Sequence, residues 1–102
     1  MNKILSMISM SKKAGKLISG EFLCENAIKG KKVNLLIIAE DASNNTKEKF
    51  HNMCISKNID YITMFKKEEL GNAIGGFQRA TIAICDKGFA VAINKLIKQV
   101  VN

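Results

Sequence analysis

The side chains best suited to catalysis in this chain are few. His51 and Cys54 stand three positions apart, the spacing of neighbours on one helix face, as a thiolate nucleophile and its base would require. No carboxylate is evident to orient the imidazole, and Cys54 falls on an apolar stripe. Glu40 and Asp41 follow an apolar run and could bind a metal or act as a base, but adjacent acids ahead of a helix more often cap it. We expect no catalytic residue, no metal site and no cofactor.

The basic side chains offer a different chemistry, the binding of phosphates. Sixteen lysines and arginines face nine aspartates and glutamates, which gives a net charge of +7. Residues 1–32 hold seven of the lysines and only two glutamates, so +5 of this charge lies in the first third of the chain. A polyanionic partner fits this balance, because cations that neutralise phosphates release bound counterions. The candidates for phosphate binding are Lys12, Lys13, Lys16, Lys29 and Lys31.

Recognition beyond charge has to come from groups other than arginine. Fifteen of the basic residues are lysines, which act as mobile point charges, and Arg79 is the single arginine. Backbone amides, Asn and Gln side chains, and shape are the remaining sources of specificity. The alternative interpretation is a lysine-rich composition that scatters solvated charge over every face.

Backbone amides are expected to be free at three points where a turn meets a helix. These points are Ser19-Gly20-Glu21, residues 41–46, and the turn Gly75-Gly76-Phe77-Gln78. Neither GxGxxG nor GxxxxGK[ST] occurs, so none of them is a P-loop. The glycines either let a partner approach the backbone closely or serve as plain helix caps. Phe77 fits a core plug and an exposed wedge equally well.

The sequence predicts that helices alternate with strands, and these elements set the positions of the three turns. Periodicity predicts helices over 3–13, from near residue 20, after the polar stretch 40–46, over 67–74 and from residue 87, with strands at 16–19, 33–39, 60–64 and 80–85. This order implies an α/β fold, a three-layer α/β/α sandwich around a small mixed, mostly buried sheet. We expect residues 1–102 to form a single domain with no membrane-spanning segment.

The same periodicity predicts which apolar side chains face the core. Leu23 is expected on the inner face of the second helix beside Cys24, and Val100 on the apolar stripe of the last helix. Three cysteines, Cys24, Cys54 and Cys85, are odd in number and widely spaced. They are therefore interpreted as small core residues and not as disulfide partners or zinc ligands.

Four ordered motifs carry a resemblance to a known family. They are Lys12-Lys13-Ala14-Gly15-Lys16-Leu17-Ile18-Ser19-Gly20-Glu21, then Ala39-Glu40-Asp41-Ala42-Ser43 with Asn45-Thr46-Lys47, then Leu70-Gly71-Asn72-Ala73-Ile74-Gly75, and Asp86-Lys87-Gly88-Phe89-Ala90. Over about residues 3–97 the chain resembles the kink-turn RNA-binding ribosomal proteins of the L7Ae and L30e type, in their small bacterial YlxQ-like branch. The resemblance implies a three-layer fold without enzymatic activity that binds RNA bent sharply at an internal loop with tandem sheared G·A pairs.

The resemblance also implies two contact sets, which coincide with two of the points where amides are free. The start of the second helix supplies Gly20, Glu21, Phe22, Leu23 and Asn26. The loop after the Leu-Gly-x-Ala-x-Gly motif supplies Gly75, Gly76, Phe77 and Gln78, with Ser43 and Lys47 flanking. The family's strongest RNA binders place a polar pair two and three residues after the glycine that opens the helix, and a lysine three residues further on. Phe22, Leu23 and Asn26 occupy those positions here, so lysines, Glu21, Asn26 and backbone amides would carry recognition.

Taken together, the sequence predicts a cytoplasmic, monomeric, non-catalytic protein that binds structured RNA of the kink-turn or rRNA-like kind and associates with the ribosome. A second hypothesis is a protein-interaction module that docks a translation factor or another acidic partner on the same surface. A small enzyme, or a lone subunit of an RNA-modifying enzyme, comes third, because 102 residues leave no length for a catalytic half.

Overall fold

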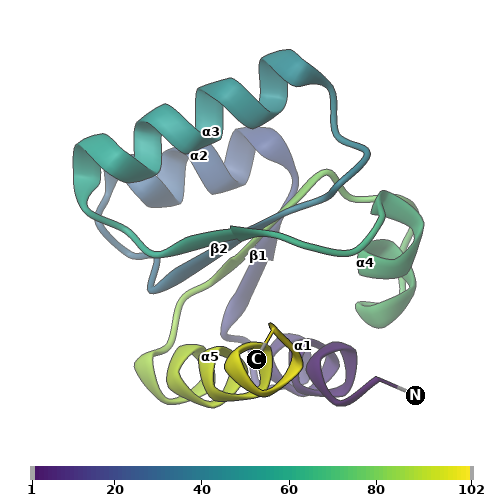
Figure 1. Ribbon diagram of the computed structural model, residues 1–102. Helices are drawn as coiled ribbons and strands as arrows, with labels where there is room; N and C mark the ends of the chain where they lie inside the picture. Colours follow the sequence, from purple (N-terminus) through teal and green to yellow (C-terminus); the bar gives the residue numbers. More distant parts are fainter. Residues whose placement is uncertain (1, 102) are drawn as a thin grey trace.

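The computed structural model describes residues 2–101 and alternates helices with short strands (Figure 1). The helices are α1 (Lys3–Lys13), α2 (Glu21–Lys29), α3 (Asn44–Lys57), α4 (Lys67–Ala73) and α5 (Lys87–Val101). The strands are β1 (Leu17–Ser19), β2 (Leu35–Ile38), β3 (Tyr61–Thr63) and β4 (Thr81–Ile84). The bounds follow the predicted ones closely, and no helix among the described residues has the length and apolarity to cross a membrane.

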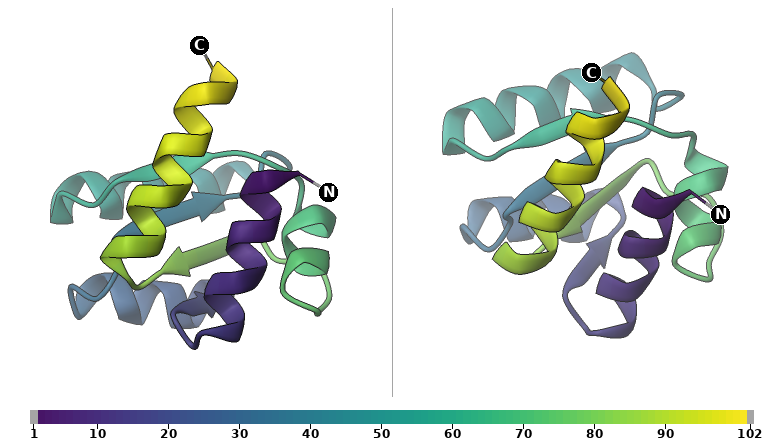
Figure 2. Two further views of the ribbon diagram at one scale, coloured as in Figure 1. Left: turned by 90° about the horizontal axis from the view of Figure 1, so that it is seen from below. Right: turned by 60° about the horizontal axis from the view of Figure 1, so that its bottom comes forward.

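The four strands form one mixed sheet in the order β1-β4-β2-β3. β4 runs antiparallel to both β1 and β2, whereas β2 and β3 are parallel. Every residue of β2 and β4 is buried, as a continuous apolar run predicts for strands covered on both faces. α2 and α3 cover one face of the sheet, α1 and α5 cover the other, and α4 stands at one end (Figures 1 and 2). The predicted three-layer α/β/α sandwich is confirmed.

Two of the apolar side-chain assignments are wrong. Leu23 is 56% exposed, because the buried stripe of α2 begins one position later at Cys24, about 100° further round the helix. Val100 is 62% exposed, because the end of α5 projects beyond the sheet (Figure 2). Cys24 and Cys54 are fully buried as expected, and Cys85 is half-buried.

Side chains cap the starts of α3 and α4, though one of them is not the predicted cap. The Ser43 hydroxyl accepts a hydrogen bond from the Thr46 amide at 3.1 Å and so caps α3. Asp41, which was expected to cap this same helix, instead accepts from the amide of Lys67 at 2.8 Å and caps α4. The start of α4 lies beside the end of β2, so the Asp41 carboxylate can accept from an amide 26 positions away in the sequence.

Candidate nucleic-acid interface

The starts of α2 and α3 lie side by side and are joined by side chains. The Thr46 hydroxyl donates a hydrogen bond to the Glu21 carboxylate at 3.0 Å, and the Ser43 hydroxyl donates to that of Thr46 at 2.9 Å. Both helices therefore present their free N-terminal amides at one corner of the molecule. The Glu21 charge is partly balanced there by the hydroxyl and by the positive end of the helix dipole.

Arg79 fastens the glycine turn to the same corner. Its Nε donates to the Ser19 hydroxyl at 3.2 Å, and its Nη1 donates to the carbonyls of Phe77 and Gln78 at 3.0 and 3.1 Å. The amide of Gly20 donates to the Thr81 carbonyl at 3.1 Å, which fixes the other side of the junction. The structure therefore brings together all three predicted points. The prediction of free amides is wrong for Gly20, Gly75 and Gly76, whose amides donate to carbonyls within the chain.

The sequence reasoning assigned no site role to Arg79. The only available signal was the position of the single arginine directly after the glycine turn. A guanidinium holds several acceptors at once in a fixed plane, which an ammonium on a flexible stem does not do. Arg79 thus acts as a positioning residue for the loop at 75–78.

Gly71 is a second positioning residue that the sequence reasoning missed. A Cβ at this position would overlap the carbonyl oxygen of Phe77 and lie 2.5 Å from its carbonyl carbon. The Gly71 carbonyl also accepts from the amide of Gly76 at 2.9 Å, so the loop folds back onto the helix that precedes it. The close approach requires a residue without a side chain, and the Leu70-Gly71 pair in the third motif was its signal.

The backbone is open to a partner at Gly20 and Gly75. Their φ angles are +93° and +74°, a conformation that side chains disfavour, and no atom lies within 4 Å of the place a Cβ would take. These two glycines therefore provide the turn geometry and also leave the backbone bare, which goes beyond the role of a plain helix cap.

Three of the predicted lysines flank this corner and three do not. Lys12 and Lys13 line a shallow cavity of about 240 Å³ with Gly75, and Lys47 lies in the first turn of α3. Lys16 precedes β1, at the opposite end of that strand from Ser19. Lys29 is the last residue of α2, about 12 Å along its axis from Glu21, and Lys31 lies two residues beyond it. Their contact with a ligand stays a prediction that is separate from this corner.

The exposed side chains of the corner are largely apolar. Phe77 is 90% exposed and Phe22 is 73% exposed, so Phe77 is a wedge and not a core plug. Leu23 adds a third exposed apolar side chain, while the polar residues Asn26 and Gln78 are also exposed.

The catalytic candidates do not assemble into a site. His51 turns its Nδ1 to the Tyr61 hydroxyl at 2.6 Å, and the two rings meet edge to face. Cys54 is fully buried, and burial raises the pKa of its thiol to about 11, so it is a poor nucleophile. Among the residues that the structure describes, no three His, Cys, Asp or Glu side chains gather as metal ligands would.

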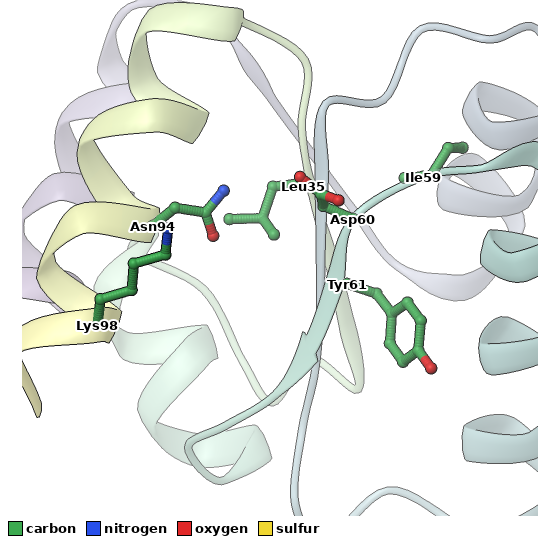
Figure 3. Close-up of a pocket in the computed structure, with 6 residues that line it drawn as sticks. All are labelled: Leu35, Ile59, Asp60, Tyr61, Asn94 and Lys98. Atoms are coloured by element: carbon green, nitrogen blue, oxygen red, sulfur yellow. The ribbon is translucent and has the colours of Figure 1, made fainter. Parts of the chain in front are cut away.

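A cavity of about 570 Å³ lies elsewhere, between α5 and the start of β2 and β3 (Figure 3). Asn94 and Lys98 face Leu35 and Asp60 across it, while the Tyr61 ring points away toward α3. It is broad and open, and it lies at the end of the sheet opposite the helix starts of α2 and α3. Its polar groups do not form a pair of acid and base around an enclosed space, so it does not offer a catalytic arrangement.

Comparison with known proteins places this geometry in a family. The pattern of the "Ribosomal protein L7Ae/L30e/S12e/Gadd45 family" matches residues 2–94. The RNA-binding protein YlxQ of Bacillus subtilis (strain 168) is 34% identical over 91 residues, which cover 89% of this chain and 88% of that protein. The chain belongs to this family. The resemblance read from the four motifs is confirmed.

Further relatives agree with this L7Ae-family assignment. The RNA-binding protein YlxQ of Enterococcus faecium is 33% identical over 96 residues, covering 94% of this chain and 92% of that protein. A solved structure of a protein with unknown function from Bacillus halodurans has a TM-score of 0.92 and 32% identity, over 96% of this chain and 99% of that one. The Giardia lamblia 15.5kD RNA binding protein has a similar fold, with a TM-score of 0.77 at 19% identity, over 94% of this chain and 82% of that one.

Proposed function

We propose that this chain is a non-catalytic, cytoplasmic RNA-binding domain that recognises sharply bent structured RNA and serves translation, in association with the ribosome. One observation carries the proposal: the two helix starts and the glycine turn, distant in sequence, meet at one corner that is flanked by lysines. Its relatives named RNA-binding protein YlxQ add support. Recognition of a kink-turn is the finer form of the same proposal.

The geometry gives each group a role. The bare backbone at Gly20 and Gly75 and the free amides at the starts of α2 and α3 approach the RNA backbone from two sides of a bend. Lys12, Lys13 and Lys47 neutralise phosphates at its flanks. An RNA long enough to follow α2 also reaches the residues at its far end, which are Lys29 and Lys31.

The test measures the affinity of the protein for a kink-turn duplex and for a straight duplex over a series of salt concentrations. Bent RNA should bind more tightly, and both affinities should fall as salt rises. The double change Lys12→Glu and Lys13→Glu should weaken binding of every RNA and lower the salt slope by about 1.4–1.8, the share of two phosphate contacts. The matched control is Lys95→Glu with Lys98→Glu on α5, which makes the same change of charge away from the corner.

A second variant tests the shape of the site. Gly76→Val places side-chain atoms against the Arg79 guanidinium, because even a Cβ at residue 76 would lie 2.9 Å from its Nη2. The loop should shift, and the bent duplex should lose more affinity than the straight one. Equal affinity of the wild-type protein for both duplexes would contradict shape recognition, and absence of a salt slope would contradict phosphate binding.

A further inference from the structure

A second basic surface lies at the end of the sheet opposite the starts of α2 and α3. Both of these helices end on this side of the molecule, and α5 begins there (Figure 1). The segments at this end carry six exposed lysines, here called the distal lysines: Lys16, Lys29, Lys31, Lys32, Lys57 and Lys87. The sequence predicts phosphate binding for the first three of them and assigns no role to the other three.

Contacts between the segments bring the distal lysines to one end of the sheet. The amide of Cys85, which follows β4, donates to the Lys16 carbonyl at 2.8 Å. Burial raises the pKa of the Cys85 thiol, and the charge of Lys32 opposes this rise, so Lys32 also lies near the end of β4. Lys29 and Lys57 line one hollow of about 400 Å³ between the ends of α2 and α3.

Few carboxylates neutralise the distal lysines. Asp60 and Asp86 stand at the same end, and Asp86 already accepts at 2.9 Å from an amide in the first turn of α5. Glu25 lies 3.8 Å from Lys29, but its shorter ion pair, at 2.7 Å, is with Lys49. Within residues 2–100, no other ion pair involves a distal lysine. Six lysines against three carboxylates, of which one is shared with Lys49, leave this surface strongly positive.

Two of the distal lysines occupy positions that folding does not favour. Lys31 has a φ of +57°, a left-handed conformation that glycine and asparagine adopt at lower cost. Lys87 is the first residue of α5, where a positive charge opposes the helix dipole. Lys29 and Lys57, by contrast, end α2 and α3, where the same dipole favours a cation. A cation at an unfavourable position indicates a role outside the fold, namely contact with an anion.

We propose that the distal lysines form a second RNA-binding surface, which holds the phosphate backbone of a duplex segment separate from the bend at the corner. This inference rests on the proposed function. Lysines act there as point charges on phosphates and do not read bases. Lys47 at the corner and Lys57 lie about 15 Å apart along α3, roughly two Debye lengths at physiological salt. The two surfaces therefore bind phosphates independently of each other.

The composition of the distal surface favours RNA over an acidic protein. None of the large apolar side chains that are exposed elsewhere falls within residues 14–19, 29–34, 57–60 or 84–88. Protein interfaces are built around apolar and aromatic side chains and are depleted in lysine. Phosphate binding needs only the cations, because release of counterions supplies its free energy.

The test asks whether the protein holds two RNAs at once. The corner is first filled with a kink-turn duplex whose arms are too short to follow α2, labelled with one fluorophore. A short straight duplex with a second fluorophore is then added. Both colours should sediment with the protein as a single complex, and the affinity for the straight duplex should fall as salt rises.

The variant Lys31→Gln with Lys32→Gln should lower the salt slope for the straight duplex by about 1.4–1.8, the share of two phosphate contacts. A slope difference of this size makes the variant about 25- to 60-fold weaker than the wild type at 0.1 M salt, with equal affinities near 1 M. The short kink-turn duplex should keep its affinity. The matched control is Lys3→Gln with Lys95→Gln, since these lysines are exposed on α1 and α5, and Lys95 lies about 12 Å along α5 from Lys87.

A single substitution separates binding from folding. Lys31→Gly removes the charge and also relieves the left-handed conformation, so it should raise the Tm while it weakens binding of the straight duplex. A raised Tm with unchanged binding would show that the Lys31 charge does not contact RNA.

The outcomes distinguish this inference from the proposed function. If the kink-turn duplex does not bind the wild-type protein, the proposed function is wrong and the second surface with it. If the kink-turn duplex binds, but the straight duplex displaces it or fails to join it, only the second surface is wrong. An equal loss in the control pair would show that overall charge alone attracts the duplex. Displacement of the straight duplex by poly-glutamate at an equal concentration of charge would indicate an acidic protein as the partner and would also contradict the inference.

Discussion

The substitution Gly71→Ala tests whether the loop at 75–78 is held in place by its close approach to α4. The added Cβ would overlap the carbonyl group of Phe77, and relief of this overlap breaks the 2.9 Å hydrogen bond from the Gly76 amide to the Gly71 carbonyl. Overpacking costs about 1–3 kcal/mol and the lost hydrogen bond about 1 kcal/mol. Replacing a helical glycine by alanine returns about 1 kcal/mol, so the free energy of unfolding should fall by about 1–3 kcal/mol.

The assay combines thermal unfolding with RNA binding. Each kcal/mol should lower the Tm by about 4–8 °C in a domain of this size. At a temperature well below the Tm of both the wild-type protein and the variant, the displaced loop should also weaken binding of the bent duplex. Gly30→Ala is the matched control, because φ at Gly30 is −83° and the nearest atom to its Cβ lies at 3.4 Å. If Gly71→Ala unfolds at the wild-type temperature and binds RNA normally, the packing argument is wrong.

Three further results are expected. Asp41→Ala removes the acceptor that caps α4 at the Lys67 amide and should lower the free energy of unfolding by about 1 kcal/mol in urea titrations, whereas Glu40→Ala should not. Burial raises the pKa of the Cys54 thiol from 9.0 to about 11. Between pH 9 and about pH 11 the thiol therefore ionises only in the unfolded chain, so the free energy of unfolding should fall over this interval. In urea titrations Cys54→Ala should lose less stability over the same interval, and an equal loss would contradict the prediction. Arg79→Lys keeps the positive charge but loses the planar set of donors that holds Ser19 and the carbonyl of Phe77. The bent duplex should therefore bind roughly tenfold more weakly, while the salt dependence of binding stays unchanged. A changed salt dependence would instead indicate that Arg79 contacts a phosphate.

Most of the fold could be predicted from local patterns. The run at 33–39 is apolar at almost every position, which is typical of a strand buried on both faces, and β2 is such a strand. Amphipathic spacing gave the helices within a few residues of their ends. The errors at Leu23 and Val100 have a common cause, since the width of a helix's buried stripe and the point where it leaves the sheet depend on tertiary packing.

The candidate site could be predicted only in parts. Glycines and capping residues identify helix starts locally, and these points were recognised. The bonds that join them, from Arg79 to Ser19 and from Thr46 to Glu21, connect residues 60 and 25 positions apart, and no local spacing reveals them. For the same reason the role of Gly71 and the cap on α4 were missed. The affinity of the lysines for RNA phosphates stays a prediction.

The central place of β4 in the sheet has a consequence for the order of assembly during translation. β4 is the last strand to be synthesised, yet it lies between β1 and β2, which do not pair with each other. A nascent chain that lacks residues 79–84 therefore has most of its cations but neither the sheet nor the arginine that aligns the loop. Selectivity for a bent ligand would arise only when this late segment has left the exit tunnel, after the charges that attract any polyanion are already exposed.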